Sequence, residues 1–91
     1  MNFFGLKELN LSNNDISKIN ALEKANFKEL KILKLSKNRI SDIGVLAKVK
    51  FEKLEYLDLS HNSKISKINV LEKVNFRELK TLNLSGNSIK E

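Results

Sequence analysis

One nine-residue pattern decides the fold of this protein, and its third copy reads Leu54-Glu55-Tyr56-Leu57-Asp58-Leu59-Ser60-His61-Asn62. The pattern occurs four times, as LKELNLSNN at residues 6–14, LKILKLSKN at 30–38, LEYLDLSHN at 54–62 and LKTLNLSGN at 79–87. The first leucines of successive copies are separated by 24, 24 and 25 residues. Self-similarity at a fixed period of this length is the sequence signature of a stacked repeat architecture. Nearly all of the 91 residues therefore belong to one repeat array.

Each repeat changes its hydrophobic period half-way. Apolar and polar residues alternate in Leu9-Asn10-Leu11, which is the period of a strand with one buried face. After the asparagine, Ile16, Ile19 and Leu22 recur every three residues, which favours a 3-10 turn or a short α-helix such as 21–26. One unit cannot bury its apolar side alone, so we expect the units to stack with their strands paired in parallel. The predicted strands lie at residues 9–11, 33–35, 57–59 and 82–84.

The motif L-x-x-L-x-L-x-x-N-x-I, repeated over residues 3–89, resembles the leucine-rich repeat proteins. The Ile-x-x-Ile-x-x-Leu spacing after the asparagine is most similar to the phosphatase-regulator and internalin-like subclasses. The resemblance implies an α/β fold, a curved solenoid with a parallel four-strand sheet on its concave face and short helical or 3-10 returns on its convex face. We expect one domain without terminal caps, with units at residues 6–29, 30–53 and 54–78 and a partial unit at 79–91.

Two sets of equivalent residues are predicted to be structural. An asparagine follows each strand, where its amide can satisfy unpaired backbone groups and bridge to the neighbouring unit. A phenylalanine precedes each first leucine by three residues, and those at 27, 51 and 76 are expected to stack in the core. The asparagines are Asn14, Asn38, Asn62 and Asn87, and the phenylalanines are Phe3, Phe27, Phe51 and Phe76. The third unit has one additional residue after Asn62, which we expect to form a small bulge in an exposed loop.

The candidate binding residues are the strand positions that alternate with the leucines, because the leucines are committed to the core. Ile32 and Tyr56 are predicted neighbours, and an exposed aliphatic side chain beside an exposed aromatic one is typical of interface anchors. The same positions suit a strand by propensity alone. We also expect an exposed ion pair between Lys34 and Asp58, worth about 0–1 kcal/mol. The predicted concave-face site comprises Glu8, Ile32, Lys34, Tyr56, Asp58, His61 and Thr81. Serines at 12, 36, 60 and 85, and Asn13, Lys37, His61 and Gly86, are predicted to form two further outward rows.

Composition argues against several functional classes. The chain has no Cys, one His and no Gly-rich phosphate loop, so we expect no enzyme activity, no metal site and no cofactor. The net charge of +6 comes from 17 Lys+Arg and 11 Asp+Glu, which are interleaved along the chain, so no specific nucleic-acid binding is expected. No apolar run is long enough to cross a bilayer, and the first residues do not resemble a signal peptide. We expect no membrane association and a cytoplasmic location.

These observations predict a protein–protein interaction module that binds an unidentified protein on its concave sheet. The alternative is a structural self-assembly unit, or a fragment of a longer array, that associates as a homo-oligomer through uncapped ends. Apolar residues such as Leu11 and Leu84 would be exposed there. The resemblance to phosphatase regulators implies a third possibility, a subunit that docks on a phosphatase.

Overall fold

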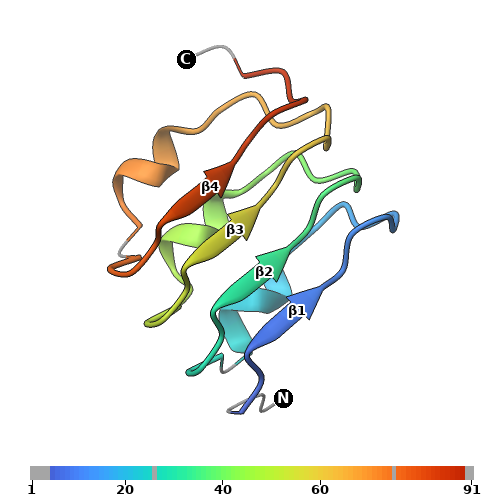
Figure 1. Ribbon diagram of the computed structural model, residues 1–91. Coiled ribbons are helices and arrows are strands. Elements are labelled where there is room, and N and C mark those ends of the chain that lie inside the picture. Colours follow the sequence, from blue (N-terminus) through green and yellow to red (C-terminus); the bar gives the residue numbers. More distant parts are fainter. Residues whose placement is uncertain (1–4, 26, 75, 90–91) are drawn as a thin grey trace.

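The sheet of this protein lies on one side of the molecule and its helical turns lie on the other (Figure 1). The computed structural model describes residues 5–25, 27–74 and 76–89. Four parallel strands pair in sequence order. The strands are β1 (Glu8–Asn10), β2 (Ile32–Lys34), β3 (Tyr56–Asp58) and β4 (Thr81–Asn83). Within the described ranges, three 3-10 helices connect the strands, namely η1 (Asn20–Lys24), η2 (Gly44–Ala47) and η3 (Asn69–Glu72).

The strands confirm the predicted pairing, although each begins one residue earlier than expected. Their register aligns Glu8, Ile32, Tyr56 and Thr81 across the sheet. The earlier start arises because the residue before each strand already takes part in the ladder. Ile32 and Tyr56 donate their backbone N–H groups to the carbonyl groups of Lys7 and Lys31, at 3.1 and 3.0 Å. Equivalent residues of successive units therefore lie directly side by side.

The connections between strands are 3-10 turns rather than α-helices. Each helix begins after an isoleucine whose carbonyl accepts a hydrogen bond three residues on, as in Leu22 N–H to Ile19 O at 3.0 Å. Ala25 then returns to extended backbone, which ends η1. The helix thus begins one residue before the expected turn at 21–26 and ends two residues before its expected end, and residue 26 lies outside the described part of the chain. So short a return keeps each unit narrow and lets neighbouring units stack.

The core is most complete in the middle of the array. Leu33 of β2 and Leu57 of β3 are fully buried, whereas their equivalent Leu82 of β4 is 37% exposed. Phe51 packs between two other phenylalanines, with ring centroids 5.7 Å from Phe27 and 5.8 Å from Phe76. The predicted aromatic stack is confirmed for these three residues, while Phe3 lies outside the described residues. Burial is therefore a property of stacking and decreases toward the outer edges of the sheet.

The asparagine ladder is the main polar element of the interior. The Asn62 amide Nδ2 donates to the carbonyl groups of Leu35, Leu59 and Ser60 at 3.2, 2.9 and 3.2 Å. Its Oδ1 accepts the Ile40 N–H at 3.0 Å, in the preceding unit. Asn38 and Asn87 make equivalent bonds across their own junctions. The predicted bridging role is confirmed, and the bonds to a second unit reach back to the preceding one.

The additional residue of the third unit is accommodated as predicted, in an exposed turn. Ser63 has a φ of 64°, and the N–H of Lys64 donates to the Asn62 carbonyl at 2.7 Å. The Ser88 hydroxyl donates to the Ser63 carbonyl at 2.7 Å from the following unit. After this turn Ile65 re-enters the core and is fully buried. The insertion therefore leaves the stacking of the flanking units intact.

At four sets of equivalent positions, charged side chains alternate in sign over three successive units. Lys53 lies across from Glu29, with its Nζ 3.2 Å from both carboxylate oxygens. The Lys80 ammonium lies 3.9 Å from the Glu55 carboxylate one junction later. The alternation holds along four sets of equivalent positions: Lys18, Asp42 and Lys67; Lys28, Glu52 and Arg77; Glu29, Lys53 and Glu78; and Lys31, Glu55 and Lys80.

Candidate functional site

The outward side of the sheet is formed by the first and last residue of each strand. We call these eight residues the sheet face. Their neighbours Leu33 and Leu57 point inward and are fully buried, so strand alternation alone separates surface from core. The sheet face comprises Glu8, Asn10, Ile32, Lys34, Tyr56, Asp58, Thr81 and Asn83. Six of these residues belong to the predicted site, and the structure places them on one surface.

A shallow hollow of about 340 Å³ lies at the centre of the sheet face. Ile32 and Tyr56 pair in the β2–β3 register and form its apolar part, and both side chains are half-buried. Thr81 and Lys34 also line it, together with Glu55 and Lys80 from the residues just before β3 and β4. The structure thus brings four predicted site residues around one depression. Ordered apolar surface beside charged groups is typical of a protein-binding anchor.

The expected ion pair between Lys34 and Asp58 is wrong. Lys34 Nζ lies 3.9 Å from Glu8 Oε2 on the opposite neighbouring strand. Asp58 instead uses its own turn, because its Oδ1 accepts the Ser60 backbone N–H at 2.9 Å. A residue two positions after a carboxylate is a nearer hydrogen-bond donor than a flexible lysine across the ladder. Since the Lys34–Glu8 pair is exposed, it contributes about 0–1 kcal/mol.

Sequence reasoning missed Glu55 and Lys80 as part of this hollow. Both residues precede a strand by one position, and the expected strands began after them. Their backbone groups nevertheless join the ladder, with Lys80 N–H donating to the Glu55 carbonyl at 2.8 Å. The sequence did contain one indication of this contact, because Glu55 and Lys80 occupy equivalent positions of successive units and have opposite charges. A partner on the sheet face would therefore also contact the charged residues that directly precede the strands.

The structure corrects the serine row in part, and it places the exposed row of Asn13, Lys37, His61 and Gly86 in turns rather than on the strands. Ser60 is buried and the Ser36 hydroxyl donates to the Ser12 hydroxyl at 3.0 Å, whereas Ser85 is exposed, so the serine row is not uniformly outward. Lys37 and His61 do not extend the strands, because they adopt left-handed backbone with a φ of 56° each. Asn13 and Gly86 share this conformation. His61 therefore lies at the turn after β3, outside the hollow lined by Tyr56.

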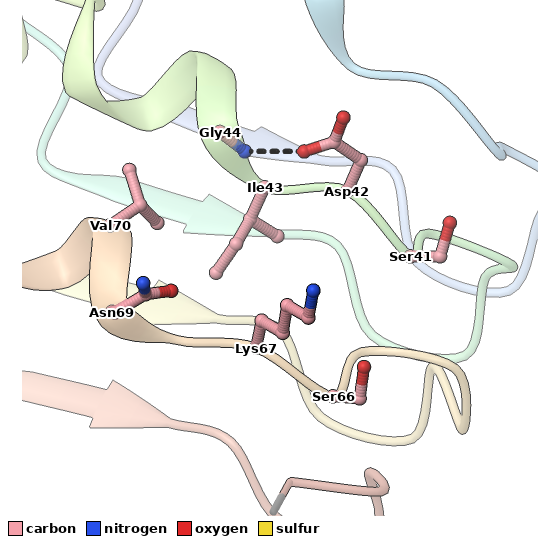
Figure 2. Close-up of a pocket in the computed structure, with 8 residues that line it drawn as sticks. All are labelled: Ser41, Asp42, Ile43, Gly44, Ser66, Lys67, Asn69 and Val70. Atoms are coloured by element: carbon pink, nitrogen blue, oxygen red, sulfur yellow. Dashed lines mark hydrogen bonds between the residues drawn. The ribbon is translucent and has the colours of Figure 1, made fainter. Parts of the chain in front are cut away.

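A second hollow of about 370 Å³ opens on the opposite side, between the segments that lead into η2 and η3 (Figure 2). Asp42 Oδ1 accepts the Gly44 N–H at 2.8 Å, so this carboxylate is engaged at the start of η2. Ser66, Lys67 and Asn69 line the other wall. Compared with the sheet-face hollow, this one lacks an aromatic side chain and is lined mostly by small polar groups.

Neither metal nor membrane sites emerge from the residues that the structure describes. Over 5–25, 27–74 and 76–89, no three His, Asp or Glu side chains are placed to hold a metal ion together. Within the same ranges, no helix has the length and apolar character required to span a bilayer.

Stacked strand–turn units with an asparagine ladder define the class of repeat solenoids. Two family models match the chain, one described as leucine rich repeat over residues 28–89 and one described as leucine rich repeats in two copies over residues 5–48. The chain belongs to the leucine-rich repeat family. Domains of this family generally mediate protein–protein interactions and are typically not enzymes. The two models do not assign a subclass. No curated protein compared with the chain matches it significantly.

Proposed function

We propose that the sheet face binds a protein partner, with Ile32 and Tyr56 as the central anchor. The observation that supports this proposal is the hollow around these two residues, which lie in register on adjacent strands. A binding surface needs side chains held in place before the partner arrives, because ordering them on association costs free energy. The buried leucines between the outward residues hold the strands rigidly, and the outward residues remain free to specify a partner.

The test compares capture of proteins by three forms of the chain. Tyr56→Asp places a charged carboxylate in the apolar part of the hollow, and Ile32→Asp does so on the neighbouring strand. Ala47→Asp is the matched control, because Ala47 is exposed on η2 at the opposite side of the molecule. We expect quantitative mass spectrometry of pull-downs to identify proteins that both sheet-face variants lose and the control retains. If every captured protein survives both sheet-face substitutions, the proposal is wrong.

A second candidate function is self-association through the outer edges of β1 and β4. In the part of the chain that the structure describes, each of these strands pairs with one neighbour only, and Leu82 on β4 is 37% exposed. Unpaired strand edges readily add a further strand. A head-to-tail contact would place Thr81 of one copy beside Glu8 of the next and continue the register.

Cysteine crosslinking distinguishes this arrangement from a two-fold one, since the natural chain contains no Cys. Glu8→Cys chains are mixed with Thr81→Cys chains and treated with a short bifunctional thiol reagent. Head-to-tail pairing gives the mixed dimer, whereas two-fold pairing of β4 edges gives a Thr81→Cys homodimer. Light scattering that shows only monomer at all concentrations would exclude this candidate.

A further inference from the structure

We infer that the partner presents an acidic segment to the sheet face, with an apolar side chain flanked on both sides by carboxylates. This inference rests on the proposed function and specifies the chemistry of its partner. It follows from three features of the sheet face: an apolar centre, a lower rim before the strands and an upper rim after them. Both rims contain cationic side chains that pair with no carboxylate among the residues that the structure describes.

The apolar centre is the contact between Ile32 and Tyr56. Both side chains are half-buried and line the same hollow. An aliphatic or aromatic side chain of the partner would cover the remaining exposed area of both. Burial of such a side chain against apolar surface is favourable, so this contact supplies affinity while the surrounding charges supply orientation.

The lower rim consists of the residues that directly precede the strands. Backbone N–H groups of Lys31, Glu55 and Lys80 each donate at 2.8 Å to the equivalent residue of the previous unit, which fixes them side by side with Lys7. Glu55 is paired with Lys80 at 3.9 Å. Lys7 and Lys31 are exposed, and within the described ranges neither lies within 4.0 Å of a carboxylate. The rim beside Ile32 is therefore positively charged.

The upper rim lies at the turns that follow β2 and β3. Lys37 N–H donates to the Ser60 carbonyl at 3.0 Å, which places the left-handed residues Lys37 and His61 next to each other. Arg39 and Lys64 follow at exposed positions. Among the described residues, ion pairs of Lys and Arg side chains involve only those at 34, 53 and 80, so the cations of this rim lack a carboxylate partner.

Carboxylates between the two rims favour an acidic protein segment over a nucleic acid. Glu8 and Asp58 lie on the sheet face itself, between the cationic rims. A continuous phosphate backbone that crosses from one rim to the other would pass these carboxylates, and like charges at short range are repulsive. A peptide can place its carboxylates over the rims and its apolar side chain over the centre. This arrangement of the peptide's carboxylates and apolar side chain matches the two cationic rims and the apolar centre of the sheet face.

The experiment selects binders from a displayed library of random short peptides, using the 91-residue chain as bait. We expect selected peptides to contain an apolar residue with Asp or Glu on both sides. Their affinity should fall at least about tenfold with the triple variant Lys31→Glu, Lys37→Glu and Arg39→Glu, because several charge pairs are lost and reversed. The control reverses Lys24, Lys48 and Lys73, which changes net charge equally on the helical side, and should alter affinity less than about twofold. Circular dichroism verifies that both triple variants are folded.

The outcomes separate this inference from the proposed function. Peptides that require Tyr56 but are neutral, or that tolerate the rim variant, overturn the acidic partner and leave sheet-face binding intact. A selection that yields no peptide sensitive to Tyr56→Asp contradicts both. Basic peptides, or binding of oligonucleotides that is lost with the rim variant and retained with Tyr56→Asp, also overturn the inference.

Discussion

At the scale of single residues, Asn62 shows how one side chain holds two units together. It is fully buried and forms four hydrogen bonds to backbone groups. If the Asn62 side chain were removed, two of its carbonyl partners would still accept a hydrogen bond. Asn38 also donates to the Leu35 carbonyl, and Asn87 also donates to the Leu59 carbonyl. The Ile40 N–H has no such alternative among the bonds of the described residues. The loss of Asn62 would therefore affect the Ile40 N–H of the preceding unit most, because this group would have no acceptor.

We predict that Asn62→Ala lowers the free energy of unfolding by about 3 kcal/mol, since a buried N–H loses its acceptor and buried carbonyl groups lose a donor. Urea denaturation measures this change. Asn14→Ala is the matched control, because Asn14 is exposed and its amide donates only within its own unit. The control should cost about 1 kcal/mol or less. Equal losses at the two positions would contradict the bridging role.

A second residue-scale prediction concerns the contact between Gly86 and His61. Gly86 has a φ of 70°, and a Cβ built on it would overlap the imidazole ring of His61. Gly86→Ala should therefore destabilise the fold by about 2 kcal/mol, from backbone strain and from displacement of the ring. In a His61→Ala background the same substitution should cost about 1 kcal/mol. Thermal denaturation of the four proteins gives this double-mutant cycle, and strict additivity would exclude the ring contact.

At the scale of elements, hydrophobic period and repeat spacing were sufficient to predict the strands, their parallel order and the short returns. The period of Leu9-Asn10-Leu11 identified the strand but not its first residue, because backbone bonding at position 8 does not depend on side-chain polarity. The partner of Lys34 was also missed. Both Glu8 and Asp58 flank it in the ladder, and only the turn geometry after β3 decides which one is free.

The additional residue of the third unit gives the element-scale prediction. Deletion of Ser63 restores the spacing of the second unit and removes a non-glycine residue with positive φ. The lost bond from the Ser88 hydroxyl is exposed, so the two effects largely offset each other. We expect the free energy of unfolding to change by less than about 1 kcal/mol. A loss of several kcal/mol in urea denaturation would indicate that the bulge is a structural requirement.

At the scale of the whole molecule, stability depends on how many neighbours a unit has. Leu57 and Leu82 occupy equivalent positions, yet Leu57 is fully buried and Leu82 is exposed at the outer edge. The sequence alone predicts this gradient from position in the array. The sequence alone does not identify which outward residues contact a partner. Strand propensity and partner binding favour the same residue types at positions such as Ile32 and Tyr56.

We predict that Leu57→Ala costs about 3 kcal/mol or more and Leu82→Ala about 1 kcal/mol. The first substitution opens a cavity between two stacked units, while the second removes a side chain that water already reaches. Differential denaturation of the two variants measures the contrast. Comparable costs would show that the edge of β4 is covered in solution, which would favour self-association.

The sign alternation of equivalent charges constrains how such an array can grow. Duplication of one unit, for example residues 30–53, would set Asp42 beside a second aspartate and Lys53 beside a second lysine. Duplication of a pair of units, for example residues 30–78, would keep neighbours opposite in sign in each of the four alternating sets. Lengthening by two units therefore preserves the alternation of these four sets, whereas lengthening by one unit places like charges side by side in each of them.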